Sequence, residues 1–351
     1  MKRFQLNIEQ GENRMKKSMS VFSLFAAGAM VLGGAGLSHA DDLKISGFGS
    51  INFNLMNEAS DNSCSDTSGT DGSTNCTELQ FSVPYAEVDF EKTVGSVTVR
   101  LDLDFNGTAN NIGNDDVEQF RFDWMLPAGQ DLGLTLTGGI FNSPIGFEAQ
   151  DSPDKLQISN GQLFNMVPSN LAGLQLAGGT DMVSGSLLFV NDWRDFGTGD
   201  LPPGATQSLG EENTLGATLA ITPMPAVGLT VGYLSSGLKP LEDTIDIVLS
   251  GTIMPSADLE LLYALEYVTN EKQDGTGITV NAMHGKHGLT IRYDMVDNDA
   301  AGAGDPTSLT VALLCSLEEN LKVKLEWRDD DPDVAGQSST DATTLQFVAL
   351  F

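Results

Sequence analysis

Apolar and polar side chains alternate along most of the chain, and this alternation restricts the possible folds more than any other feature. Residues 97–105, 289–295 and 321–328 place apolar side chains at one parity and mostly charged side chains at the other. Successive side chains of a strand point to opposite faces of its sheet, so each segment has one apolar face and one polar face. A soluble β-sandwich would explain one or two such strands, but the pattern recurs in about sixteen segments.

The connections between these segments are alternately long and short. The predicted strands are 43–56, 79–92, 97–105, 117–126, 132–141, 171–178, 185–191, 213–221, 228–235, 244–252, 259–268, 277–284, 288–296, 307–316, 321–328 and 341–351. Long polar connections such as 57–78 and 192–212 alternate with short turns such as 93–96 and 317–320. We therefore predict an all-β fold, a transmembrane antiparallel β-barrel of about 16 strands (14–18) with long extracellular loops and short periplasmic turns. Hydrocarbon offers no partner to an open sheet edge, so the sheet must close.

The two ends of the chain fit export to an outer membrane. Lys16 and Lys17 precede an apolar run, and residues 38–40 offer small residues for cleavage, which predicts a signal peptide over 1–40 with translation starting at Met1 or Met15. Residues 41–351 then form a single barrel domain. The last strand ends in alternating apolar residues and Phe351, which resembles the signal that the barrel assembly machinery of Gram-negative bacteria reads. The expected location is the outer membrane, in contact with lipid and lipopolysaccharide.

The charge balance excludes a nucleic-acid partner. The chain carries 18 basic and 48 acidic residues, a formal net charge of −30, which repels phosphate backbones and attracts cations. Cys64 and Cys76 lie in a polar segment and are predicted to form a disulfide in an exported protein, while Cys315 is left over in an apolar strand.

Residues for catalysis or for a cofactor are not evident. His284 and His287 flank a tight turn, and the chain has no nucleophile elbow, phosphate loop or zinc-protease motif. Acidic loop segments such as 297–299 lack the full set of calcium ligands. We expect no enzyme activity, no cofactor and no metal site.

One stretch resembles a known family. Residues 136–148, LTGGIFNSPIGFE, look like a G-x-F-x-S-P-x-G-x-E signature, and residues 190–193, VNDW, are similar to an N-G-W-D strand end in which Asp192 replaces the glycine and Arg194 the final aspartate. Together they resemble the putative β-barrel porin, OmpL-like, family of outer-membrane proteins. The resemblance implies a monomeric or oligomeric pore, supplies no catalytic residue and leaves the solute open.

The 29-residue connection 142–170 is longer than an idle loop requires. It carries Glu148, Asp151 and Asp154 against a single Lys155, so we expect it to fold into the barrel as an acidic constriction that selects cations. The alternative is a flap over the mouth of the barrel.

Charged side chains on the strands should face the lumen, because a midplane Arg or Lys facing lipid costs about 2–4 kcal/mol. Besides the three loop acids, the predicted pore-lining residues are Arg100, Asp102, Asp104, Arg121, Asp123, Arg292, Asp294, Lys324 and Glu326.

These features predict a porin, a water-filled channel for passive diffusion of small hydrophilic solutes and ions that prefers cations. Two alternatives stay open: a non-conducting structural or adhesive barrel, and a substrate-specific diffusion channel. The first is disfavoured because side chains alone do not fill a lumen of this width. The outer face of residues 213–221 carries small side chains, so association of several copies of the barrel into a homo-oligomer is a further open possibility.

Overall fold

The computed structural model describes residues 43–59, 75–105, 117–191, 213–235, 243–299, 304–334, 337 and 339–351. The predicted signal peptide and Cys64 lie outside these residues, as do Trp193 and Arg194 of the second family motif. Cys76 belongs to a described strand, but its side chain is outside the described set, so the predicted disulfide stays a prediction.

The described chain is built almost wholly of strands. They are β1 (Lys44–Ala59), β2 (Asn75–Ser82), β3 (Ala86–Val94), β4 (Val97–Asp104), β5 (Val117–Met125), β6 (Thr135–Asn142), β7 (Asn170–Gly179), β8 (Val183–Asn191), β9 (Asn213–Met224), β10 (Val227–Ser235), β11 (Thr244–Ser256), β12 (Leu259–Asn270), β13 (Gln273–His284), β14 (His287–Asn298), β15 (Thr307–Glu318), β16 (Leu321–Asp331) and β17 (Thr340–Leu350). Two short 3₁₀ helices, η1 (Pro127–Leu132) and η2 (Leu163–Met166), lie between β5 and β6 and between β6 and β7. None of the helices in these residues is long and apolar enough to cross a membrane.

The seventeen strand segments form sixteen barrel strands, as predicted. Both β2 and β3 pair with β1, β2 with residues 52–59 and β3 with residues 44–49, so the two together occupy one position in the wall. The interruption falls at residues 83–85. Pro84 has no backbone N–H to give to the ladder, which explains why the predicted strand 79–92 is divided there.

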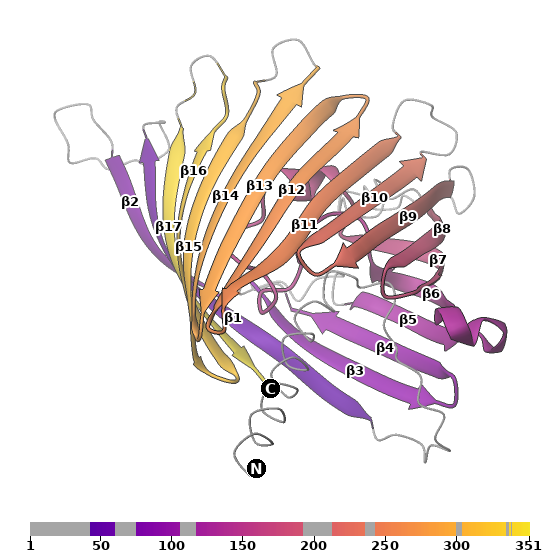
Figure 1. Ribbon diagram of the computed structural model, residues 1–351. Coiled ribbons are helices and arrows are strands. Elements are labelled where there is room, and N and C mark those ends of the chain that lie inside the picture. The colour runs from indigo at the N-terminus through magenta and orange to yellow at the C-terminus, as the bar shows by residue number, and fades with distance from the viewer. Residues whose placement is uncertain are drawn as a thin grey trace, which may run out of the picture.

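The sheet closes on itself through the first and last strands. β1 pairs with β17 in an antiparallel register that runs from Phe48 opposite Leu350 to Asn57 opposite Asp341. The other strands pair antiparallel with their sequence neighbours. Figure 1 shows the resulting wall of tilted strands around an interior. Closure leaves no seam of unpaired backbone between β1 and β17, as a bilayer requires.

Tight turns gather at one end of the barrel, which we call the short-turn end. Gly95 and Gly285 adopt positive φ values of 64° and 60° there, a conformation that hairpin turns need and glycine adopts without strain. One connection at the opposite end is shorter than predicted. β12 and β13 continue to Asn270 and Gln273 and are joined by residues 271–272, where the sequence pattern indicated a loop over 269–276. The polar residues of that segment extend the ladder instead of leaving it.

The two faces of the wall are reversed relative to a soluble protein. In β14, Leu289, Ile291, Tyr293 and Met295 are exposed, whereas Thr290, Arg292 and Asp294 are buried. Soluble proteins bury apolar side chains and expose charges. The opposite arrangement suits a barrel whose outer face meets lipid and whose inner face meets polar groups and water.

Candidate pore constriction

The segment between β6 and β7, residues 143–169, lies inside the ring of strands (Figure 1), and we call it the inner loop. Its backbone amides donate to carboxylates on inward faces of the wall. Gly146 N lies 2.9 Å from Asp246 Oδ2, and Phe147 N lies 3.0 Å from Glu266 Oε1. These strand acids therefore give the loop amides the partners that an irregular buried backbone needs.

Farther along the loop the same pattern continues. Ile158 N and Ser159 N donate to the Glu326 carboxylate of β16 at 2.6 and 3.1 Å, and Gln162 N donates to Asp294 Oδ2 of β14 at 3.2 Å. The inner loop is thus held against β11, β12, β14 and β16.

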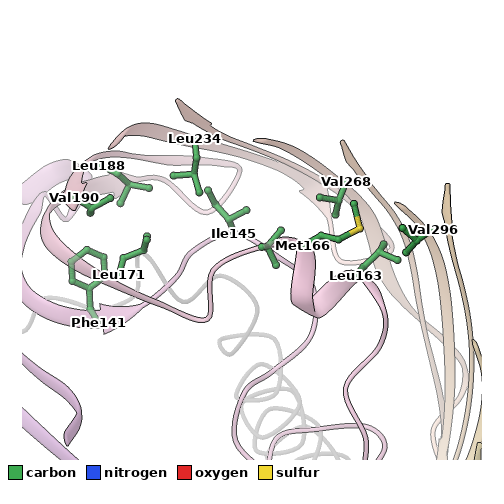
Figure 2. Packing of buried hydrophobic residues seen from close by; sticks show 11 residues of the cluster. Phe141, Ile145, Leu163, Met166, Leu171, Leu188, Val190, Leu234, Val268 and Val296 are labelled. Atoms are coloured by element: carbon green, nitrogen blue, oxygen red, sulfur yellow. The ribbon is translucent and has the colours of Figure 1, made fainter. Parts of the chain in front are cut away.

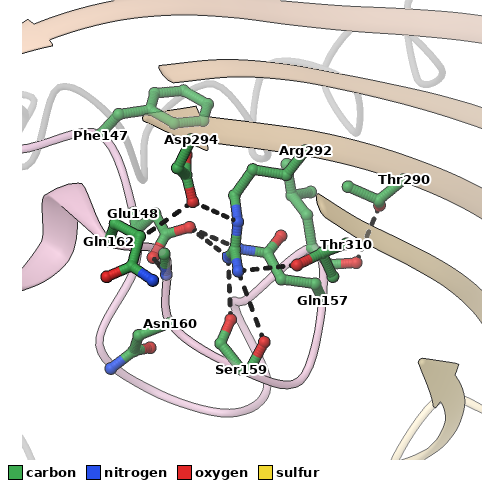
Figure 3. Close-up of polar contacts among 12 residues, drawn as sticks. Phe147, Glu148, Gln157, Ser159, Asn160, Gln162, Thr290, Arg292, Asp294 and Thr310 are labelled. Atoms are coloured by element: carbon green, nitrogen blue, oxygen red, sulfur yellow. Dashed lines mark hydrogen bonds and ion pairs between the residues drawn. The ribbon is translucent and has the colours of Figure 1, made fainter. Parts of the chain in front are cut away.

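Arg292 of β14 is the centre of a buried ion cluster beneath the loop (Figure 3). Its Nη1 lies 2.5 Å from Glu148 Oε1 and 2.9 Å from Ser159 O, and its Nε lies 3.0 Å from Asp294 Oδ2. Glu148 Oε2 also accepts a hydrogen bond from Gly161 N at 2.7 Å. Arg292 is 1% exposed. A cation buried to this degree is tolerated because two carboxylates and a carbonyl surround it.

Gly161 is required by the tight approach of the loop to this cluster. A Cβ at this position would lie 2.6 Å from Asp294 Oδ2 and 3.0 Å from Glu148 Oε1.

Three basic residues on the inward face of β16 bind loop carbonyls. Lys324 Nζ donates to Ser152 O, Lys155 O and Gln157 O at 2.7, 2.8 and 3.1 Å. Lys322 and Arg328 donate to one further loop carbonyl each, those of residues 153 and 160. Lys324 is completely buried, so its three ammonium protons all serve the loop.

An apolar cluster fixes the two ends of the inner loop (Figure 2). Ile145, Leu163 and Met166 of the loop pack against inward-facing apolar residues of β8, β10, β12 and β14. The cluster comprises Phe141, Ile145, Leu163, Met166, Val167, Leu171, Leu188, Val190, Leu234, Val268 and Val296. Sequence reasoning predicted a polar lumen and missed it. The available signal was apolar residues at inward parity near the ends of strands, such as Leu188 and Val190.

The wall of β3 to β6 presents a separate array of mixed charges. Arg100 Nε lies 2.7 Å from Asp102 Oδ1, and Arg121 Nε lies 3.0 Å from Asp123 Oδ2. Gln119 Nε2 also donates to Asp102, at 2.6 Å. Arg100, Arg121 and Asp123 are each about a quarter exposed, so these pairs border open space.

The loop acids divide between the two walls. Glu148 points back to Arg292, whereas Asp151 lies close to Glu87 of β3 and Glu118 of β5. Burial, together with the carboxyl of Asp154, raises the pKa of Asp151 to about 6. Burial also lowers the pKa of Lys155, whose Nζ lies 5.5 Å from the centre of the Tyr85 ring.

The predicted site residues therefore fall into two sets. Arg292, Asp294, Lys324 and Glu326 face inward but are covered by the inner loop, and they anchor it, together with Glu148 of the loop itself. The residues on the other wall are Arg100, Asp102, Asp104, Arg121 and Asp123, and Asp151 of the loop lies against this wall. Asp154 of the loop lies near Lys322 and Lys324 of β16. A cavity of about 730 Å³ lies between the loop and the short-turn halves of β8 to β16, bordered by Ser186, Thr230, Glu260, Asn281 and Lys322 among others.

Comparison with known proteins gives a family and a fold. The sequence model of the family described as "Putative beta-barrel porin-2, OmpL-like" matches residues 42–302, which confirms the resemblance found in residues 136–148. The search of curated proteins returned no match.

Solved porins share the architecture at low identity. An anion-selective porin from Comamonas acidovorans is 10% identical with a TM-score of 0.58, the alignment covering 88% of this chain and 99% of that one. A mutant of the Rh. blastica porin is 13% identical with a TM-score of 0.54, covering 88% and 100%. OmpTdeltaL8, a loop deletion mutant of the Vibrio cholerae outer membrane protein OmpT, is 11% identical with a TM-score of 0.54, covering 89% and 100%. At such identity the likeness carries the fold and not the ion preference.

Proposed function

The chain belongs to the Putative beta-barrel porin-2, OmpL-like family, and we propose that it forms a water-filled channel for passive diffusion of small hydrophilic solutes and ions, with a preference for cations. Membership of a porin family and the closed barrel point to an outer-membrane channel rather than an enzyme. The inner loop would form the constriction, and the open path would run beside the loop, past the partly exposed side chains of Arg100, Arg121 and Asp123.

The observation that carries the cation preference is where the positive charges lie. Arg292 and Lys324 are buried beneath the loop, where they contact carboxylates, hydroxyls and loop carbonyls. On the other wall, Arg100 and Arg121 each pair with an aspartate. Asp104 of β4 and Asp151, which lies close to Glu87 and Glu118, add further acidic groups to this wall. This distribution supports a negative potential in the open space, which would concentrate cations.

The non-conducting barrel remains the second candidate, because the inner loop fills part of the lumen and its tip approaches β3 and β5. The cavity of about 730 Å³ beneath the loop favours a water-filled interior instead. Single-channel recording separates the two candidates.

The test is the current of purified mature protein in planar bilayers under a KCl gradient. We expect stepwise conductance and a reversal potential of the sign that cations produce. Asp123→Asn removes the partner of Arg121 and should lower the ratio of potassium to chloride permeability by about twofold. The matched control is Asp297→Asn, because Asp297 is exposed and lies on the outward face of β14. Anion selectivity of the wild type would overturn the cation preference, and absence of conductance steps would overturn the channel.

A further inference from the structure

Three carboxyl groups from distant parts of the chain meet at the tip of the inner loop. They belong to Glu87 of β3, Glu118 of β5 and Asp151 of the loop, and one oxygen of each lies within 4.8 Å of the others. Like charges so close repel strongly unless one of the carboxyl groups is protonated or a cation lies between them.

The basic side chains nearby, among the described residues, make their closest contacts with other groups. Arg100 contacts Asp102 at 2.7 Å and Asp89 at 3.6 Å. Arg121 donates to Gln119 and Asp123. Lys155 lies over the rings of Tyr85 and Phe164 at 5.5 and 5.9 Å. None of the ion pairs among the described residues joins one of these cations to Glu87, Glu118 or Asp151.

Burial makes the missing partner costly. Glu87 is only 3% exposed, and its hydrogen-bonding neighbour is another carboxyl, that of Asp89. Glu118 Oε1 is also buried and has no hydrogen-bond partner within the described structure. Buried carboxylates without donors are rare because the loss of hydration is not offset. A ligand of opposite charge would supply what these oxygens lack.

We propose that Glu87, Glu118 and Asp151 bind a calcium ion that joins the tip of the inner loop to the wall of β3 and β5. Calcium–oxygen distances of about 2.3–2.6 Å allow ligand oxygens to lie up to about 4.6–5.2 Å apart across the ion. All three oxygens lie within 4.8 Å of one another, which is compatible with that geometry. Magnesium demands a nearly octahedral set of ligands and gives up its water reluctantly, so three carboxyl groups from separate segments suit it less well. Water would complete the coordination.

The site has a consequence for the channel, and this part rests on the proposed function. A bound Ca²⁺ cancels two negative charges at the loop tip and ties that tip to the wall opposite the anchors on β14 and β16. Ca²⁺ should therefore reduce the cation preference and narrow the path beside β3 and β5.

Binding is tested on the folded full-length mature protein in detergent, freed of metal by a chelator and titrated with Ca²⁺ by isothermal calorimetry at neutral pH. We expect saturable binding of one ion, with Mg²⁺ binding more weakly. Asp151→Asn and Glu87→Gln should each weaken the Ca²⁺ affinity by at least about tenfold. Asp258→Asn, in an exposed turn at the short-turn end, should leave the affinity unchanged.

Calcium binding and channel conductance are measured separately, so the calcium site and the channel are tested independently. Asp151 is in the loop and outside the strands, so Asp151→Asn should fold, and the heat-dependent gel mobility of the barrel checks this for each variant. Absence of saturable Ca²⁺ binding, or an affinity unchanged in both Asp151→Asn and Glu87→Gln, overturns the site and leaves the channel standing. Binding that is lost in these variants, in a protein without conductance, supports the site and overturns the channel.

Discussion

Individual charged residues in this barrel serve two purposes that the sequence pattern does not distinguish. An acid at an inward position can border open space, as Asp123 does, or it can accept backbone amides of the inner loop, as Glu326 does. The difference lies in the loop that covers one wall and not the other. Alternation predicts that a side chain points inward, whereas its partners depend on residues more than a hundred positions away.

Arg292→Met tests the ion cluster beneath the loop. The variant leaves Glu148 and Asp294 as buried carboxylates without their cation, which costs about 3–5 kcal/mol. We expect the barrel to persist while the inner loop loosens, giving faster proteolysis within residues 143–169 and noisier channel currents. Thr310→Val removes one hydrogen bond to the same guanidinium and keeps both ion pairs, so its effect should be about 1 kcal/mol. Equal proteolysis of Arg292→Met and wild type would show that the cluster does not hold the loop.

Gly161→Ala tests the closeness of the loop to the same cluster. The added Cβ would lie 2.6 Å from Asp294 Oδ2, so the loop or the carboxylate has to move. We expect a loss of about 1–3 kcal/mol in loop anchoring, visible as increased hydrogen exchange of the amides of 158–162. Gly49→Ala, where a Cβ meets nothing within 4 Å, is the matched control. If the two variants show the same exchange, the packing at Gly161 is looser than its distances indicate.

At the scale of elements, period-two alternation predicts the strands almost to their ends, because one face of each strand must suit lipid throughout its length. β4 was predicted as 97–105 and spans Val97–Asp104. The break between β2 and β3 was not predicted, although Pro84 signals it. The apolar cluster that holds the inner loop was also missed. It joins Leu163 and Met166 of a loop to Val268 and Val296 of two strands, and no local pattern links residues so far apart.

Leu163→Ala tests this apolar anchor. Leu163, the first residue of η2, is 3% exposed and belongs to the same apolar cluster as the inward-facing Val268 of β12 and Val296 of β14 (Figure 2). Truncation of a buried leucine costs about 2–5 kcal/mol, and here the cost falls on the loop because the ladder of the barrel is untouched. Hydrogen exchange should quicken over residues 163–167 and stay slow in β12. Leu174→Ala removes the same atoms from an outward-facing side chain that is 46% exposed, and it should leave the exchange of the loop unchanged.

The whole molecule is asymmetric about its lumen. β4 and β6 have eight residues each, whereas β11 to β14 have 12 or 13. The taller wall carries the acids and bases that bind the inner loop, and the shorter wall carries the array of Arg100, Arg121 and their aspartates. A solute that passes the loop tip would therefore meet fixed backbone on one side and charged side chains on the other. Selectivity should respond to substitutions on the shorter wall, and conductance noise to substitutions on the taller one.

Phe351→Ala tests how the closed barrel is assembled. Phe351 ends the strand that seals the sheet, and its backbone exchanges two hydrogen bonds with Gly47, at 3.0 and 3.2 Å. These bonds do not involve the phenyl ring. Phe351 as a whole is 68% exposed. Removal of the ring should therefore change the free energy of unfolding of the purified barrel by less than about 0.5 kcal/mol.

If the assembly machinery recognises the Phe351 ring, the amount of folded Phe351→Ala protein in the outer membrane of expressing cells should fall severalfold. Phe347→Ala, in the same strand and on the same outward face, controls for the loss of an exposed aromatic ring. A drop in refolding yield that matches the drop in cells would instead assign Phe351 a structural role in closure.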